Sequence, residues 1–163
     1  MNLNEHPELI TRPEMHYVFV ERAGSFVQNA GAAWQEAHKL APALRENNQI
    51  TGYMALYKMG PKIYRAGFST EAEPVRVPEG MKYEIVPAGK YLRFVLTGPY
   101  TDLPQASGKV WEIVGEKKLG VRDDFATENY VNDPSVTPAD QLITHIMVPT
   151  ILSAEFKALQ VEV

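Results

Sequence analysis

The most informative absence from this chain of 163 residues is cysteine. Without a thiol the chain cannot form a disulfide, a thiolate nucleophile or a cysteine-ligated metal site. No stretch approaches the roughly 18 apolar residues of a membrane span, and the first residues lack the basic and apolar regions of a signal peptide. The net charge of −4 gives no indication of a phosphate-binding surface. These absences predict a cytoplasmic protein that binds neither membrane nor nucleic acid directly.

Nucleotide and metal sites also lack support in the sequence. The glycines do not show the G-x-x-x-x-G-K-[ST] or G-x-G-x-x-G spacing of nucleotide-binding loops. The four histidines, at positions 6, 16, 38 and 145, are not at metal-ligand spacing. A Ser-His-Asp triad stays open, but no G-x-S-x-G elbow supports one. We therefore expect no metal and no cofactor.

The hydrophobic content of 45% and charged content of 22% are typical of a soluble globular protein with a sizeable core. Apolar residues at three- and four-residue steps predict helices over residues 26–45 and about 102–118. Pro42 is expected to end or kink the first helix. Runs rich in β-branched and aromatic residues predict strands. The predicted strands cover residues 16–24, 50–58, 62–69, 82–98 with a break at 87–89, 123–133 and 141–150.

These elements form an internal repeat, because the order strand, helix, strand, strand occurs twice. Gly24-Ser25-Phe26 precedes the first helix and Gly98-Pro99-Tyr100 the second. Trp34 and Trp111 lie within the two helices. The repeat predicts an α+β fold in which both halves build a curved antiparallel sheet, with two helices on one face and a central cleft. The predicted domain covers residues 14–150, with repeats at about 14–70 and 82–150 and terminal extensions at 1–13 and 151–163.

Glu128 is the candidate functional residue that the strand pattern singles out. If residues 127–131 form a strand, Glu128 and Tyr130 share one face, and Asn129 and Val131 share the other. Polarity alone does not show which face is the core. A glutamate on a strand is usually exposed, because an unpaired buried carboxylate is costly. An inward Glu128 among aromatic rings would instead have a raised pKa or attract a cationic ligand.

Aromatic residues on two other predicted strands alternate in the same way: Tyr53 and Tyr57 share one face of their strand, and Tyr64 and Phe68 share one face of the next. Core packing accounts for any one of them, but as a set that faces the two helices they would form an aromatic pocket. His145 and Met147 share a face of the last strand. A lone histidine between apolar neighbours is usually a core or edge residue.

The second half of the sequence resembles the GyrI-like small-molecule-binding domain family, which includes the effector-binding domains of BmrR- and Rob-type regulators. The resemblance rests on an ordered set of short motifs: Gly98 with Tyr100, Trp111, Glu128 with Tyr130, Asp133-Pro134, and Pro149. The first half matches more loosely, through "ERAGSF" and "YRAGF". The resemblance covers residues 14–150, and the chain is similar to the stand-alone members of the family rather than to regulators that carry a DNA-binding domain.

The resemblance implies a ligand cleft with Glu128 as its carboxylate, Tyr130 facing the pocket, and Trp111 as the helix aromatic. Some family members resemble hydrolases that use the same glutamate with a tyrosine. One departure is His145, where the family often has an acidic residue. Another is Gly108 within the second helix, which could permit close approach of a ligand or of a strand.

We therefore expect a protein that binds a small hydrophobic, cationic molecule. The expected ligand-binding residues are Glu128, Tyr130, Trp111, Trp34, Tyr53, Tyr64, Phe68, Met147 and His145. One alternative is a hydrolase with Glu128 as general acid/base and Tyr130 as donor. A second titratable group within hydrogen-bond reach of Glu128 would favour it. The other alternative, a protein-interaction or inhibitor module, would require a large exposed apolar patch.

Overall fold

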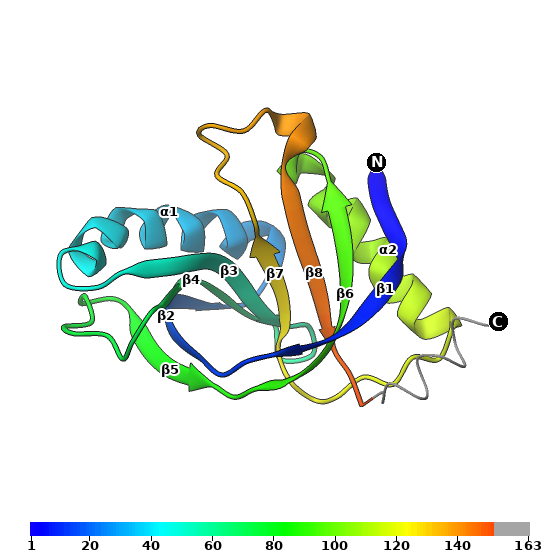
Figure 1. Ribbon diagram of the computed structural model, residues 1–163, viewed down its shortest axis with the longest axis horizontal. Helices are drawn as coiled ribbons and strands as arrows, with labels where there is room; N and C mark the ends of the chain where they lie inside the picture. Colours follow the sequence, from blue (N-terminus) through cyan, green and yellow to red (C-terminus); the bar gives the residue numbers. More distant parts are fainter. Residues whose placement is uncertain (152–163) are drawn as a thin grey trace. The chain divides into compact units, whose positions relative to one another are not determined.

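The computed structural model describes residues 1–151 and has an α+β fold. The chain divides into two compact units. The repeat-one unit is Pro13–Ala88, and the repeat-two unit combines Met1–Arg12 with the chain from Gly89 onward. Among residues 1–151, each unit contains one long helix and four strands that pair antiparallel. The predicted order strand, helix, strand, strand is present in both units (Figure 1).

The repeat-one unit places its helix on one face of its sheet. The strand order is β3-β4-β2-β5, and α1 contacts β4 and β2. The small side chains Ala33, Ala37 and Ala41 are buried in α1, which lets the helix lie close to the strands. The elements are β2 (Met15–Ala23), α1 (Phe26–Arg45), β3 (Ile50–Lys58), β4 (Ile63–Thr70) and β5 (Lys82–Val86).

The helix α1 continues through Pro42 to Arg45, so Pro42 does not end it. A proline inside a helix removes the backbone donor to the residue four positions earlier. Only three residues follow Pro42 in α1, so this loss falls in the last turn of the helix.

The repeat-two unit has the equivalent strand order β7-β8-β6-β1. Its core lies between α2 and one sheet face, where Phe94, Leu96 and Ile146 pack against Ala106 and Val110. The elements are β1 (Asn2–Arg12), β6 (Gly89–Thr97), the 3-10 helix η1 (Tyr100–Asp102), α2 (Leu103–Glu116), β7 (Ala126–Tyr130), the 3-10 helix η2 (Ala139–Gln141) and β8 (Ile143–Pro149).

The edge strands are exchanged between the repeats, which differs from the predicted domain boundaries. Residues 2–12 of the expected terminal extension 1–13 form β1, which pairs with β6 (Figure 1). Residues 82–86, assigned to the second repeat, form β5, which pairs with β2. The polar sequence of β1 contains Pro7 within a bulge between Asn4 and Glu8, so it lacks the regular alternation that identifies a strand. The expected C-terminal extension lies, apart from Ile151, outside the described residues.

Candidate functional site

Glu128 lies on the face of its sheet that α2 covers. Residues directly opposite each other in antiparallel strands have side chains on the same face. Glu128 pairs with Ile146 of β8, and Ile146 belongs to the core that packs against α2. Tyr130 pairs with Thr144, which is fully buried and shares a face with Ile146 by strand alternation. The strand register thus answers the question that polarity leaves open, and Glu128 points toward the helix side.

The Glu128 carboxylate is partly buried and accepts a hydrogen bond from a neutral donor. The Tyr130 hydroxyl donates to Glu128 Oε2 over 3.1 Å. Burial raises the pKa of Glu128, and the hydrogen bond from Tyr130 offsets part of that increase. Within residues 1–151, no lysine, arginine or histidine contributes to the shift of this carboxyl group. Glu128 is therefore an acid without a cationic partner in the described part of the chain.

Aromatic side chains lie on the same side of the sheet as this carboxylate. The ring of Tyr100 makes an edge contact with Tyr130, with 5.3 Å between centroids. Trp111 packs against the core of the unit from α2. Lys109 Nζ lies 3.9 Å from Glu5 Oε1 of β1, so Lys109 is on the β1 side of the helix. Trp111 follows Lys109 by two residues, which corresponds to a rotation of about 200° around the helix axis. Trp111 therefore lies on the flank of α2 away from β1, which is the flank toward β7 in this sheet. We call Glu128, Tyr130, Tyr100 and Trp111 the carboxylate cluster.

Four of the other predicted residues form an aromatic cluster in the repeat-one unit. The Trp34 indole donates to the Tyr64 hydroxyl over 2.9 Å, and Phe68 makes edge contacts with both Trp34 and Tyr53. Tyr64 and Phe68 alternate onto one face of β4, which is the face under α1. The structure therefore brings Trp34, Tyr53, Tyr64 and Phe68 together on the helix side of this sheet.

His145 and Met147 lie on the opposite face of their sheet from Glu128, because they alternate with Thr144 and Ile146 in β8. Burial and the charge of Arg93 lower the pKa of His145, so the imidazole tends to be neutral. The structure therefore does not bring these two predicted residues together with the carboxylate cluster.

That opposite face also holds an arginine that the sequence does not single out. Arg12 donates to the Tyr91 hydroxyl at 2.5 Å and to the Thr127 hydroxyl at 2.8 Å. Its guanidinium carbon lies 4.3 Å from the centre of the Tyr91 ring. Arg12 comes from β1, which the sequence pattern does not predict as a strand, so no sequence signal places it beside β6 and β7.

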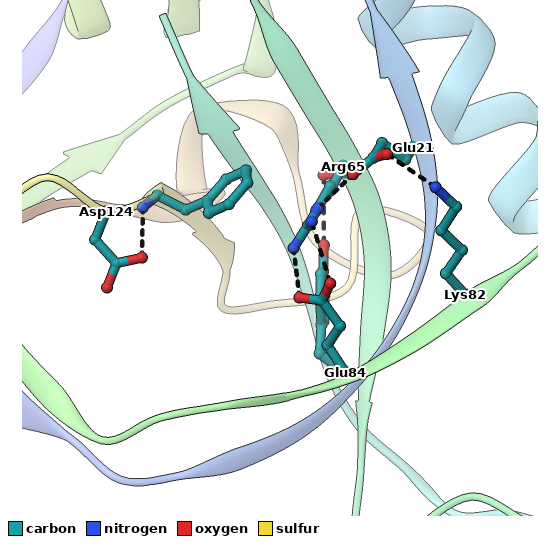
Figure 2. Close-up of polar contacts among 7 residues, drawn as sticks. Glu21, Arg65, Lys82, Glu84 and Asp124 are labelled. Atoms are coloured by element: carbon teal, nitrogen blue, oxygen red, sulfur yellow. Dashed lines mark hydrogen bonds and ion pairs between the residues drawn. The ribbon is translucent and has the colours of Figure 1, made fainter. Parts of the chain in front are cut away.

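In the repeat-one unit, two acidic and two basic side chains form a network of ion pairs. Figure 2 shows Arg65 paired with Glu21 and Glu84, while Lys82 pairs with Glu21. Burial pushes the pKa of Glu21 up, but hydrogen bonds from Lys82 and Arg65 outweigh that effect and lower it. Because two acids and two bases satisfy one another here, this network stabilises the sheet and is a weak candidate for a ligand site.

A surface hollow at the end of α1, in the repeat-one unit, has a volume of about 560 Å³. The charged and amide side chains from Arg45 to Gln49 line most of it, together with Tyr53. It is wide open and contains no buried charged group. We therefore favour the carboxylate cluster as the functional site.

Tyr100 is a member of the cluster that the sequence-based prediction omits. It occupies the position that Phe26 has in the other repeat, just before the helix. Phe26 contacts Tyr57 and Tyr64 of its own unit, as Tyr100 contacts Tyr130. The repeated Gly-x-aromatic motif was therefore a signal that could have identified it.

Among residues 1–151, no three His, Cys, Asp or Glu side chains gather into a potential metal site. No helix in the same range combines the length and hydropathy needed to cross a bilayer.

Comparison with solved structures shows the same fold in several proteins. The C-terminal domain of EcmrR has a TM-score of 0.74 at 13% identity, with 90% of this chain and 98% of that domain covered. SAV2435 bound to tetraphenylphosphonium has a TM-score of 0.72 at 15% identity, with 88% and 93% covered. A hydrolase from Listeria innocua has a TM-score of 0.57 at 12% identity, with 89% and 91% covered.

Sequence comparison gives the family directly. No curated protein sequence matches the chain. The model of the GyrI-like small molecule binding domain matches residues 5–150, which is most of the chain and includes both units. The protein with this carboxylate cluster therefore belongs to the GyrI-like small-molecule-binding domain family.

Proposed function

We propose that this protein binds a lipophilic cation, with the Glu128 carboxylate as the anchor for its positive charge. The observation that carries the proposal is the partly buried carboxylate without a cationic partner among residues 1–151. Burial penalises an unpaired charge, and a ligand of opposite charge removes that penalty. A bound cation would therefore favour the ionised form of Glu128.

The rings of the carboxylate cluster support a cation with a large apolar surface. A positive charge near the face of an aromatic ring gains about 0.5–2 kcal/mol. Tyr130 and Tyr100 are in contact beside Glu128, and Trp111 lies on the adjoining flank of α2. Small-molecule binding is the property of the family, and SAV2435, which has the same fold, is bound to the lipophilic cation tetraphenylphosphonium. A hydrophobic cation is thus the ligand class that these residues fit best.

The proposal is tested by titrating the wild type and Glu128→Gln with tetraphenylphosphonium. Glutamine keeps the size of the side chain and an oxygen that can accept from Tyr130, but it removes the charge. We expect saturable binding to the wild type and at least tenfold weaker binding to the variant, which corresponds to about 1.4 kcal/mol. Glu116→Gln, at the end of α2, is the matched control and should bind as the wild type does. Equal affinity of wild type and Glu128→Gln would remove the anchor role.

A hydrolase is the second candidate, and the hydrogen bond between Tyr130 and Glu128 is the observation that favours it. A carboxyl group with a raised pKa beside a phenol can serve as a general acid or base, which contributes typically 10²–10⁴-fold to rate. The Listeria innocua protein with the same fold is described as a hydrolase.

An ester-hydrolysis assay separates the two candidates. For a binding protein we expect p-nitrophenyl ester hydrolysis at the same background rate with the wild type and with Glu128→Gln. Tyr130→Phe, which removes the donor to Glu128, should leave that rate unchanged as well. Turnover by the wild type that falls about 100-fold or more in Glu128→Gln would establish the hydrolase instead.

A further inference from the structure

Three buried polar side-chain atoms from η1, α2 and β8 of the repeat-two unit lack hydrogen-bond partners within residues 1–151. They are the Tyr100 hydroxyl, the Trp111 indole nitrogen and the Thr144 hydroxyl. Buried polar atoms in folded proteins are nearly always paired, so each exception requires an explanation. On the opposite face of the same sheet the Nε atoms of Arg12 and Arg93 also lack partners among residues 1–151, whereas the Tyr91 and Thr127 hydroxyls accept from Arg12.

The three atoms belong to the same part of the unit. Tyr100 contacts the ring of Tyr130, and Thr144 is directly opposite Tyr130 in the β7–β8 pairing. Trp111 lies on the flank of α2 toward β7, by the helix geometry described above. They therefore lie on or beside the face of the sheet that carries Glu128.

The chemistry of these groups restricts what can pair with them. An indole nitrogen can only donate a hydrogen bond, and a tyrosine hydroxyl both donates and accepts. The Glu128 carboxylate accepts from Tyr130 and makes no hydrogen bond with the Tyr100 hydroxyl. A group that satisfies Trp111 must therefore be an acceptor, such as a carbonyl, ester or ether oxygen.

We infer that the ligand is a lipophilic cation that carries a hydrogen-bond acceptor, and that Tyr100 and Trp111 donate to this acceptor. The inference rests on the proposed function, since it concerns the same site. Glu128 pairs with the positive charge, and the two donors select among cations of similar size. Tyr100 is then a specificity-determining residue, whereas Glu128 sets affinity for the class. Burial raises the pKa of Tyr100, with a smaller contribution from Asp133, so its hydroxyl stays protonated and able to donate at neutral pH.

The test compares two delocalised cations: rhodamine 6G, which has ester and ether oxygens, and tetraphenylphosphonium, which has no acceptor. The variant is Tyr100→Phe, which removes one oxygen and keeps the ring against Tyr130. We expect Tyr100→Phe to bind rhodamine 6G five- to tenfold more weakly and tetraphenylphosphonium within twofold of the wild type. Its thermal stability should equal or exceed that of the wild type, because the hydroxyl removed has no partner in the described chain.

Each other outcome has a distinct meaning. If Tyr100→Phe changes neither affinity, or changes both equally, the inference that the ligand carries an acceptor for Tyr100 is overturned. Glu128 keeps its proposed role in that case, provided that Glu128→Gln still binds both ligands more weakly. If the wild type binds neither cation saturably, the proposed function fails and the acceptor inference fails with it. Trp111→Phe gives a second measurement, with a selective loss of rhodamine 6G again expected.

Discussion

Replacing Gly67 with alanine is expected to destabilise the protein by about 3 kcal/mol, a large effect for the addition of a single methyl group. Gly67 lies within β4, where it pairs with Phe19 of β2 and Met54 of β3. A β-carbon at this position would lie 2.3 Å from the Val18 carbonyl oxygen and 2.7 Å from the Phe19 β-carbon. Those neighbours belong to a strand paired on both sides, so they cannot move without disturbing the sheet.

The measurement is thermal and chemical unfolding of Gly67→Ala beside Gly108→Ala. For a chain of this size, about 3 kcal/mol corresponds to a decrease of about 6–12 °C in Tm. Gly108 lies inside α2, and no neighbouring atom lies within 4 Å of a β-carbon added there. The close approach that the sequence left open for Gly108 is therefore not made by any described residue, and Gly108→Ala should gain about 0.5–1 kcal/mol. A loss below about 1 kcal/mol for Gly67→Ala would mean that β2 gives way to the added methyl group at little cost.

Without ligand, Glu128→Gln is expected to stabilise the protein by about 2 kcal/mol at pH 7, because it removes a partly buried charge that has no cationic partner among residues 1–151. The raised pKa of Glu128 fixes the pH dependence. Between the ordinary glutamate pKa of about 4.3 and the raised folded value, the folded state binds more protons than the unfolded state. The contribution of Glu128 to the stability of the wild type therefore falls as pH rises through this window. The advantage of Glu128→Gln should appear there and vanish below about pH 4.

Glu21→Gln is the matched control, with the opposite sign. The pKa of Glu21 is lowered, so its ionised form stabilises the folded state. That contribution is present above the ordinary glutamate pKa and is lost as pH falls through the lowered folded value. We expect Glu21→Gln to cost about 1 kcal/mol at pH 7, since it weakens the pairs with Arg65 and Lys82 (Figure 2), and to cost almost nothing at low pH. Unfolding curves of all three proteins from pH 3 to 8 measure both trends. A Glu128→Gln variant less stable than the wild type at pH 7 would contradict the conclusion that the charge of Glu128 destabilises the unliganded protein.

The two Glu128→Gln predictions are linked. The charge that destabilises the unliganded protein is the charge proposed to hold the ligand, so the variant should be more stable and bind more weakly. This exchange of stability for function is common at binding sites. A variant that is more stable but binds equally well would indicate a buried acid without a role in binding.

Local patterns in the sequence are sufficient for most of the individual elements. The apolar periodicity predicts α1 over residues 26–45, and the structure has the same bounds. The strand at residues 50–58 also agrees, because its alternation and its flanking turns are local features. Alternation likewise puts Glu128 and Tyr130 on one face, and the hydrogen bond between them is consistent with that. These features depend on neighbouring residues alone.

Strand pairing is decided only by the tertiary structure. β1 joins β6 and β5 joins β2, so each edge strand pairs with the repeat that it does not directly precede in the chain. An edge strand has a neighbour on one side only, so about half of its backbone groups are unpaired, and it buries few side chains. Its sequence therefore carries little information about that neighbour. The polar β1 is the clearest case, and Arg12 reaches Tyr91 and Thr127 through it.

The tertiary structure also decides on which face of the sheet Glu128 lies. By itself the sequence determined the two repeats, their helices, and the pairing of Glu128 with Tyr130 on one strand face. Only the register of β7 against β8, which sets Glu128 opposite Ile146, decided that this face is the one under α2 and that His145 and Met147 lie on the other. A shift of one residue in register would exchange the two faces, and register depends on contacts between segments far apart in the chain.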